Sequence, residues 1–204
     1  MTVSRDKRKR LTRLDWINAA KEYGQEFGFE NLAIEPLAAR IGATKGSFYW
    51  HFADQPALLD AVMAEWEDKA TRQVIEQIEH TAQAADQQDE LDHLFRLILS
   101  PHPDDGAEWK LIAAASHPQI GPAVVRVHGL RIDYVAARLR ARGLSTSHAH
   151  ERARFLYAAY VGHLLLTQSA PGLPEVSASG LRELFLAAAD GGGTSRQPDH
   201  APRA

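Results

Sequence analysis

Apolar side chains recur every three or four positions along most of this chain, and no long stretch alternates with the period of two that marks a β-strand. The pattern therefore predicts an all-α protein. Three short helices are expected near the N-terminus, over about residues 12–27, 34–40 and 44–50. Longer helices are expected over about residues 54–84, 89–99, 105–115, 119–142, 146–170 and 177–189. The expected fold thus has about nine helices, in a small N-terminal group and a larger C-terminal body.

The expected helix ends carry residues suited to them. Thr12 and Asp54 precede helical segments, and their side-chain oxygens can cap the free amide groups of a first turn. Gly28 is placed to end the first helix, because glycine readily takes the left-handed conformation common at helix ends. Gly24 lies inside that helix, where glycine costs about 1 kcal/mol relative to alanine. The sequence therefore predicts a local weakness at Gly24.

Residues 37–52 carry the main functional signal. A short helix with the apolar residues Leu37 and Ile41 meets Gly42, which can turn the chain sharply, and Thr44 can cap a second short helix. This is the pattern of a helix-turn-helix, whose second helix enters the major groove of DNA.

Polar side chains around that second helix are the predicted DNA contacts, because base edges and phosphates are bound by short donors and acceptors and by cations. The predicted contact residues are Thr44, Lys45, Gly46, Ser47, Tyr49, Trp50, His51 and Arg40. Tyr49 and His51 fit either a phosphate contact or a structural role, and Arg40 fits either a phosphate contact or a surface charge. Phe48 and Phe52 are instead expected in the hydrophobic core.

Charge is distributed unevenly along the 204 residues. The net charge is -3, yet residues 1–52 hold nine Lys or Arg against six Asp or Glu, and residues 53–204 hold 14 against 20. A basic end on an acidic body is expected where that end meets phosphates, although a solubilising basic tail would give the same asymmetry. The chain has no cysteine, which excludes disulfides and thiolate metal sites. The longest apolar run, residues 155–170, is too polar for a membrane span, so a soluble cytoplasmic protein is expected.

The expected domain organisation follows from these patterns. Residues 1–10 are expected to be a basic arm, residues 11–56 the helix-turn-helix domain, and residues 57–190 the helical body. Residues 191–204 are rich in Gly, Pro, Ser and charge, and are expected to be a disordered tail. No flexible linker is expected between domain and body.

Residues 13–60 resemble the DNA-binding domain of the TetR/AcrR family of bacterial transcriptional regulators. The resemblance rests on Ile17-Asn18-Ala19-Ala20, Gly28-Phe29-Glu30, Leu37-Ala38, the run IGATKGSFYWHF from Ile41 to Phe52, and Leu58-Leu59. The ending Tyr-x-His-Phe after Lys-Gly-Ser is far more specific than a bare helix-turn-helix. The chain departs from the family at two positions that contact the DNA backbone, since Ala33 stands where Thr is common and Gln55 where Lys is common. The basic arm is expected to compensate for them.

The resemblance implies a homodimer in which the last two helices of each copy pair as a four-helix bundle, so that two recognition helices read one palindrome. The apolar faces of those helices supply the candidate interface residues Leu156, Tyr160, Leu164, Leu181, Leu184 and Phe185. The same faces equally suit the internal core of one chain.

The resemblance also implies a pocket for a small-molecule effector within the body. Large side chains suited to a mostly apolar ligand are the candidate pocket residues Trp66, Phe95, Trp109, Tyr134, Tyr157 and His163. Each of them suits ordinary core packing as well. The sequence does not identify the effector.

An enzymatic site is not expected. The chain lacks the Gly-x-Ser-x-Gly, phosphate-loop and dinucleotide motifs, and His148 and His150 have no carboxylate at the spacing of a known zinc motif. No catalytic residue, metal site or cofactor is therefore predicted.

The favoured function is a homodimeric repressor that binds a palindromic double-stranded DNA operator and is released by a small-molecule effector. One alternative is a DNA-binding dimer without small-molecule control. The least favoured is a metal-dependent helical enzyme. A structure without a cavity in the body would favour the DNA-binding dimer over the repressor that a small molecule releases.

Overall fold

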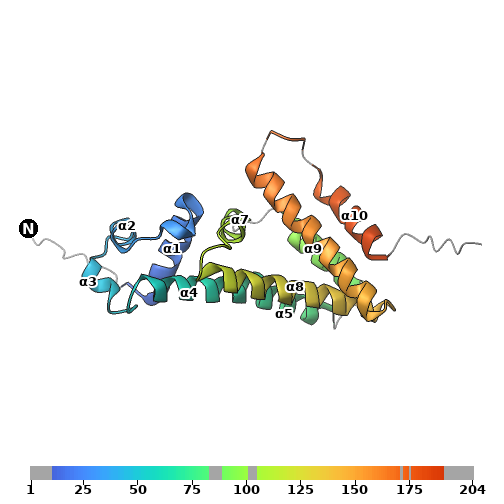
Figure 1. Ribbon diagram of the computed structural model, residues 1–204, viewed down its shortest axis with the longest axis horizontal. Helices are drawn as coiled ribbons and strands as arrows, with labels where there is room; N and C mark the ends of the chain where they lie inside the picture. The colour runs from blue at the N-terminus through green and yellow to red at the C-terminus, as the bar shows by residue number, and fades with distance from the viewer. Residues whose placement is uncertain (1–10, 83–88, 101–104, 171, 175, 191–204) are drawn as a thin grey trace, which may run out of the picture.

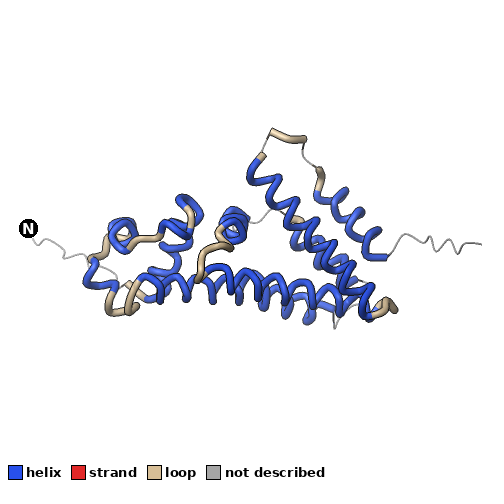
Figure 2. The backbone as a smooth tube through the Cα atoms, viewed as in Figure 1, coloured by secondary structure: helices blue, strands red, loops and turns tan. Residues whose placement is uncertain are grey.

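The computed structural model describes residues 11–82, 89–100, 105–170, 172–174 and 176–190. The basic arm expected at residues 1–10 and the tail expected at residues 191–204 lie outside the described residues. All regular structure in the described part is helical, as predicted (Figure 2). Its elements are α1 (Arg13–Phe27), the 3-10 turn η1 (Phe29–Asn31), α2 (Ile34–Arg40), α3 (Lys45–Phe48), α4 (Gln55–Glu67), the π-helical segment η2 (Asp68–Arg72), α5 (Gln73–Ala82), α6 (Asp89–Ile98), α7 (Asp105–Ala113), α8 (Ile120–Ala141), α9 (Thr146–Ser169) and α10 (Ala178–Asp190).

Local sequence sets several helix ends. Thr12 and Asp15 form a capping box, in which the Asp15 amide donates to Thr12 Oγ1 at 3.3 Å and the Thr12 amide donates to Asp15 Oδ2 at 2.6 Å. The Asp54 carboxylate caps α4 by accepting from the Ala57 amide at 2.8 Å. Gly28 ends α1 with φ at 91°, a left-handed value that favours glycine. The predicted caps at Thr12 and Asp54 are therefore confirmed.

Gly24 has a packing role that the sequence did not reveal. Phe29 in η1 folds back against α1, and a Cβ atom at position 24 would lie 2.4 Å from the Phe29 ring. That ring is 1% exposed. The helix therefore accepts the low propensity of glycine because only glycine leaves room for the aromatic ring.

The single helix predicted over residues 54–84 contains an interruption. The chain passes from α4 through η2 into α5, and the Gln73 amide donates to the carbonyl of Asp68, five residues back. Such π turns are rare, and they displace carbonyl groups from the regular helical ladder. The contacts that use this displaced backbone come from α8.

The helices form an elongated molecule with the N-terminal group at one end (Figure 1). α8 packs against α4 and η2 along one side, and α9 returns along α8 to make the most extensive helix pair in the described part. A turn at Gly143 joins them, with φ at 94°. α10 packs on α6 and α9, and α7 lies between α1 and the α8–α9 pair.

Two hydrophobic clusters fill the molecule. The first runs without a break from Trp16 in α1 to Val127 in α8, and the second joins α5, α6 and the later helices around Leu91 and Phe185. The first cluster includes Phe52, which precedes residue 56, and Leu58, Val62 and Trp66 of α4, which follow it, so the N-terminal helices and the body share one core there. A movement of the body near α4 is therefore felt directly by the N-terminal domain.

Candidate nucleic-acid interface and internal cavity

The helix-turn-helix is built by a glycine-centred turn. The Ala43 amide donates to the Ala38 carbonyl at 2.7 Å and the Gly42 amide to the Ala39 carbonyl at 3.3 Å, which is the Schellman arrangement of a helix end. Gly42 has φ at 64°. Thr44 then caps α3 by accepting from the Ser47 amide at 3.2 Å. The turn and cap predicted from sequence are therefore confirmed.

Aromatic packing holds α3 against the rest of the domain. Phe48 is fully buried, with its ring 5.2 Å from that of Trp16 and 5.5 Å from that of Phe52. Phe52 is 4% exposed, and the Arg13 guanidinium lies over its ring at 4.7 Å. The prediction that Phe48 and Phe52 belong to the core is confirmed, and this packing fixes which side of α3 faces outward.

None of the eight predicted DNA contacts is buried. Thr44, Lys45, Gly46 and Arg40 are exposed, and Ser47 and His51 are partly buried. Tyr49 is 53% exposed and Trp50 87% exposed, and such exposure is unusual for a large aromatic side chain. α3 and the turn after it therefore present donors, a cation and two aromatic rings to the outside.

Both cations near the turn are paired in the free chain. Lys45 forms an ion pair with Glu35 of α2, and Arg40 forms one with Glu26 of α1. The hydrogen bond from Lys45 lowers the pKa of the Glu35 carboxyl, and the hydrogen bond to Glu26 raises the pKa of Arg40. Because all four groups are at the surface, phosphate oxygens can compete with these carboxylates for the cations.

The two departures from the family pattern take ordinary structural positions. Ala33 precedes α2 without any side-chain capping bond, as its methyl group requires, and Gln55 is the first residue of α4. Neither position supplies a cation to the surface.

The body contains a cavity of about 430 Å³. Among the predicted pocket residues, Trp66, Tyr134 and Tyr157 line it. Phe95, Trp109 and His163 do not line it, and Phe95 instead packs edge-on against Phe185 in the second core cluster, with ring centroids 5.2 Å apart. The cavity also reaches the N-terminal domain, since Lys21 of α1 and Phe29 of η1 contribute to its wall.

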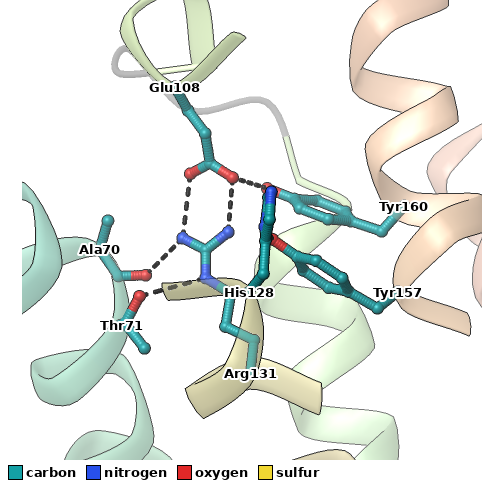
Figure 3. Close-up of polar contacts among 7 residues, drawn as sticks. All are labelled: Ala70, Thr71, Glu108, His128, Arg131, Tyr157 and Tyr160. Atoms are coloured by element: carbon teal, nitrogen blue, oxygen red, sulfur yellow. Dashed lines mark hydrogen bonds and ion pairs between the residues drawn. The ribbon is translucent and has the colours of Figure 1, made fainter. Parts of the chain in front are cut away.

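A polar network of Ala70, Thr71, Glu108, Arg131 and Tyr160 stands at the wall of this cavity (Figure 3). Arg131 donates to both carboxylate oxygens of Glu108 at 2.5 and 3.0 Å, to Thr71 Oγ1 at 3.1 Å, and to the Ala70 carbonyl of η2 at 2.8 Å. The Tyr160 hydroxyl donates to Glu108 at 3.2 Å. The network therefore ties α7, α8 and α9 to the π turn.

Sequence reasoning missed this network, although the chain carries a signal for it. The core positions of α8 recur at Ile120, Val124, Val127 and Val135, and Arg131 occupies the same helical stripe. A cation in an apolar stripe requires a buried partner. Glu108, one residue after the buried Ala107, is that partner, but no sequence pattern pairs the two.

Burial and the network set the charge states around the cavity. Burial lowers the pKa of Arg131, but the facing Glu108 carboxylate outweighs that effect and leaves it above the ordinary value. Burial, with help from Arg131, lowers the pKa of His128, whose Nδ1 lies 2.7 Å from the Tyr157 hydroxyl. Burial raises the pKa of Tyr157, and raises that of Tyr134 to about 12. The cavity wall therefore holds one fixed ion pair and neutral aromatic hydroxyls near neutral pH.

The residues predicted for a dimer interface divide between the core and the surface. Leu156, Leu164 and Phe185 are 2%, 6% and 6% exposed within the single chain. Tyr160 and Leu181 are partly buried against the second cluster, and Leu184 is 65% exposed. The sequence pattern marked the apolar face correctly as apolar, but most of that face is already covered by the chain's own helices. The large apolar side chains exposed on α9 and α10 are Phe155, Leu165, Leu166 and Leu184.

In the described part of the chain, no group of three or more His, Asp or Glu side chains is arranged to hold a metal ion. None of the helices that the structure describes is long and apolar enough to cross a membrane.

Comparison with known proteins places the N-terminal domain in a family. Residues 17–62 match the model of the bacterial regulatory proteins of the tetR family. The tetracycline repressor protein class D of Escherichia coli is 39% identical over 56 residues, which are 28% of this chain and 26% of that protein. The A-factor receptor protein of Streptomyces griseus is 37% identical over 49 residues, 24% of this chain and 18% of that protein. The chain thus matches about a quarter or less of the length of these relatives, in the domain that carries α1 to α4.

The fold agrees with solved structures over most of the chain. A TetR transcriptional regulator from Legionella pneumophila superimposes with a TM-score of 0.72 at 19% identity, covering 86% of this chain and 95% of that one. A transcriptional regulator from Rhodococcus sp. Rha1 superimposes with a TM-score of 0.70 at 17% identity, covering 88% and 95%. Residues 17–62 thus match the tetR family of bacterial regulatory proteins, and the chain as a whole shares the fold of these two solved structures.

Proposed function

We propose that the chain is a DNA-binding transcriptional regulator that reads its site through α3. The observation that carries the proposal is the outward face of α3 and the following turn, where Lys45, Tyr49 and Trp50 are exposed above a rigid aromatic core. The family of residues 17–62 supports it. Lys45 is suited to guanine acceptors or a phosphate, and the two aromatic residues to the sugar-phosphate backbone.

In this proposal, a second copy of the chain supplies a second recognition helix for the same DNA site. A helix as short as α3 contacts few base pairs, so a two-fold dimer on a palindrome is the arrangement that yields a specific site. Phe155, Leu165, Leu166 and Leu184 are exposed on α9 and α10, and burial of such side chains is what stabilises a dimer. The interface therefore uses this outer face, with Leu184 shared between it and the residues predicted from sequence.

Effector control is the third part of the proposal. The cavity of about 430 Å³ lies within the range of small-molecule sites, roughly 300–1,000 Å³, and its wall includes Lys21 and Phe29 of the N-terminal domain. A ligand that fits the cavity better when this domain is displaced would favour a dimer whose recognition helices no longer match the operator. This favours a repressor released by a small molecule over a DNA-binding dimer without such control.

Binding to the DNA upstream of the protein's own gene tests the first part. The expected result is salt-sensitive binding to that fragment, far tighter than to a scrambled fragment. Equal affinity for both fragments would contradict the proposal.

Lys45 and its partner provide a sharper test on the same DNA. Lys45→Ala should weaken binding and, where the contact is to a phosphate, reduce the salt slope by about one. Glu35→Gln should strengthen binding, because Lys45 no longer has an ion pair to give up. Arg140→Ala removes an exposed charge at the far end of α8 and serves as the control. A Lys45 variant that behaves like the Arg140 variant would refute the assigned role.

The dimer is tested by sedimentation of matched surface variants. Leu184→Glu should shift the protein toward monomer and weaken operator binding with it, because a charge is costly in an apolar interface. Val125→Glu is the control, since Val125 is 69% exposed on α8, outside the proposed face. Unchanged dimerisation of the Leu184 variant would place the interface elsewhere.

A further inference from the structure

The C-terminal end of α1 is held by side chains from outside the helix. The last carbonyl groups of an α-helix have no amide partner within it. The Phe27 carbonyl accepts from Asn31 Nδ2 at 2.7 Å, and the Glu26 carbonyl accepts from Lys110 Nζ of α7 at 2.9 Å. The last turn of α1 has no basic residue of its own, although the negative end of a helix dipole favours a cation. Lys110 therefore supplies, from the body, the cation that this helix end lacks.

Lys110 donates from a helix that is itself fixed. α7 lies between α1 and the α8–α9 pair (Figure 1). Ala107 and Leu111, on either side of Lys110 in the sequence, are 4% and 1% exposed and belong to the same hydrophobic cluster as α1. Glu108 of α7 is held in addition by its ion pair with Arg131. A hydrogen bond from such a rigid element fixes the backbone that accepts it.

The residue that Lys110 holds is the one that pairs with Arg40. The Glu26 carboxylate accepts from the guanidinium of Arg40, which lies at the end of α2, two residues before Gly42 of the helix-turn-helix. Glu26 thus has one bond to the body through its backbone and one to the helix-turn-helix through its side chain.

Lys110 also offsets negative charge at this end of α1. Glu22, one turn before Glu26, acts electrostatically on Arg40 as well. When Arg40 leaves Glu26 for a phosphate, two carboxylates remain beside the DNA backbone and repel it. The Lys110 ammonium stays at the helix end in that state and reduces the repulsion.

We infer that Lys110 is a positioning residue for DNA binding, which holds the end of α1 from the body and, through Glu26, sets the place of Arg40 at the DNA surface. The inference rests on the proposed function, because it concerns how the same DNA-binding surface is positioned. The body therefore contributes a side chain to the DNA-binding end of the molecule, besides the proposed dimer interface and effector site.

The affinity of full-length Lys110 variants for the DNA upstream of the protein's own gene tests the inference. Lys110→Met removes the ammonium and should weaken binding about 3- to 10-fold, the effect of one hydrogen bond of ordinary strength. Lys110→Arg keeps the charge and a donor, and should restore most of the affinity. Arg96→Met is the control, since it removes an exposed cation that pairs with Asp92 within α6, and it should bind as the wild-type protein does.

A double-variant cycle separates positioning of Arg40 from a merely structural role. Where Arg40→Ala has already removed the phosphate contact, Lys110→Met should cost less than about 2-fold in affinity. A merely structural loss would be equal in both backgrounds. All variants are compared at a temperature at which circular dichroism shows each of them to be folded, so that unfolding does not reduce the measured affinity.

Three outcomes would overturn the inference. They are unchanged affinity of the Lys110→Met protein, no recovery in Lys110→Arg, or an equal loss with and without Arg40. A scrambled DNA fragment is measured in the same assay. Specific binding by the wild-type protein together with one of these outcomes would refute the role of Lys110 alone, whereas equal affinity of the wild-type protein for both fragments would refute the proposed function.

Discussion

Replacing Arg131 by methionine tests the polar network that ties three helices to the π turn. The Arg131 and Glu108 side chains are 15% and 11% exposed, so the substitution leaves a carboxylate in a largely buried site. Removing one partner of a buried ion pair costs about 3–5 kcal/mol, which is a large part of the roughly 5–15 kcal/mol that stabilises a whole domain. Arg131→Met should lower the free energy of unfolding by that amount at neutral pH.

The loss in Arg131→Met should depend on pH in a defined direction. Without Arg131, the Glu108 carboxylate has no counter-charge in a largely buried site, and its ionised form is the one that burial penalises. Acid that neutralises this carboxylate removes the penalty, so the difference in stability from the wild-type protein should shrink as the pH is lowered and be largest at neutral pH and above.

Urea unfolding followed by far-UV circular dichroism measures both effects. The double variant Arg131→Met with Glu108→Leu should lose less stability than Arg131→Met alone, because no charge is left in the core. Arg96→Met is the control, since its side chain is 63% exposed in an ion pair with Asp92, and it should cost less than about 1 kcal/mol. An Arg131 variant no less stable than the Arg96 variant, or a double variant less stable than the single one, would refute the reasoning.

Two further predictions concern the packing of α1 and the titration of α8. Gly24→Ala should destabilise the protein despite the better helix propensity of alanine, because the new Cβ would lie 2.4 Å from the Phe29 ring. Gly129→Ala, in open space on α8, should instead stabilise the protein by about 0.4–1 kcal/mol. Thermal unfolding measures both changes, and higher stability of both variants would contradict the packing role of Gly24. Because the pKa of His128 is lowered in the folded state, the unfolded chain binds protons first as the pH falls below about 6.5, so this residue should reduce stability on acidification, and His128→Gln should reduce that loss. Urea unfolding from about pH 7.5 to about pH 5 would show parallel curves for wild type and His128→Gln if the histidine were not responsible.

Features decided within a few residues were predictable. The caps at Thr12, Thr44 and Asp54 and the glycine-centred turns at Gly28 and Gly42 lie where the sequence places them, because each depends on one side chain or one glycine beside the amide groups that it satisfies. The aromatic pair Phe48 and Phe52 was equally accessible, since helical spacing alone turns it inward.

Partnerships between distant segments were not predictable. The pattern marked the faces of α9 and α10 as apolar, but only the packing of α10 on α6 showed that Phe185 is covered and Leu184 is not. The pocket candidates were chosen by residue type alone. Only three of the six line the cavity, because residue type does not show which helices the fold brings together.

The sequence by itself determined an all-helical fold with a helix-turn-helix near its N-terminus and the residues that this motif leaves outside the core, because these depend on local periodicity, capping and turn chemistry. Tertiary structure alone decided that Gly24 makes room for Phe29, that Arg131 meets Glu108 and the π turn, and that Trp66 and Tyr134 both line one cavity. Those residues lie on different helices, and whether a side chain is core, ion pair or ligand contact depends on what the fold brings opposite it.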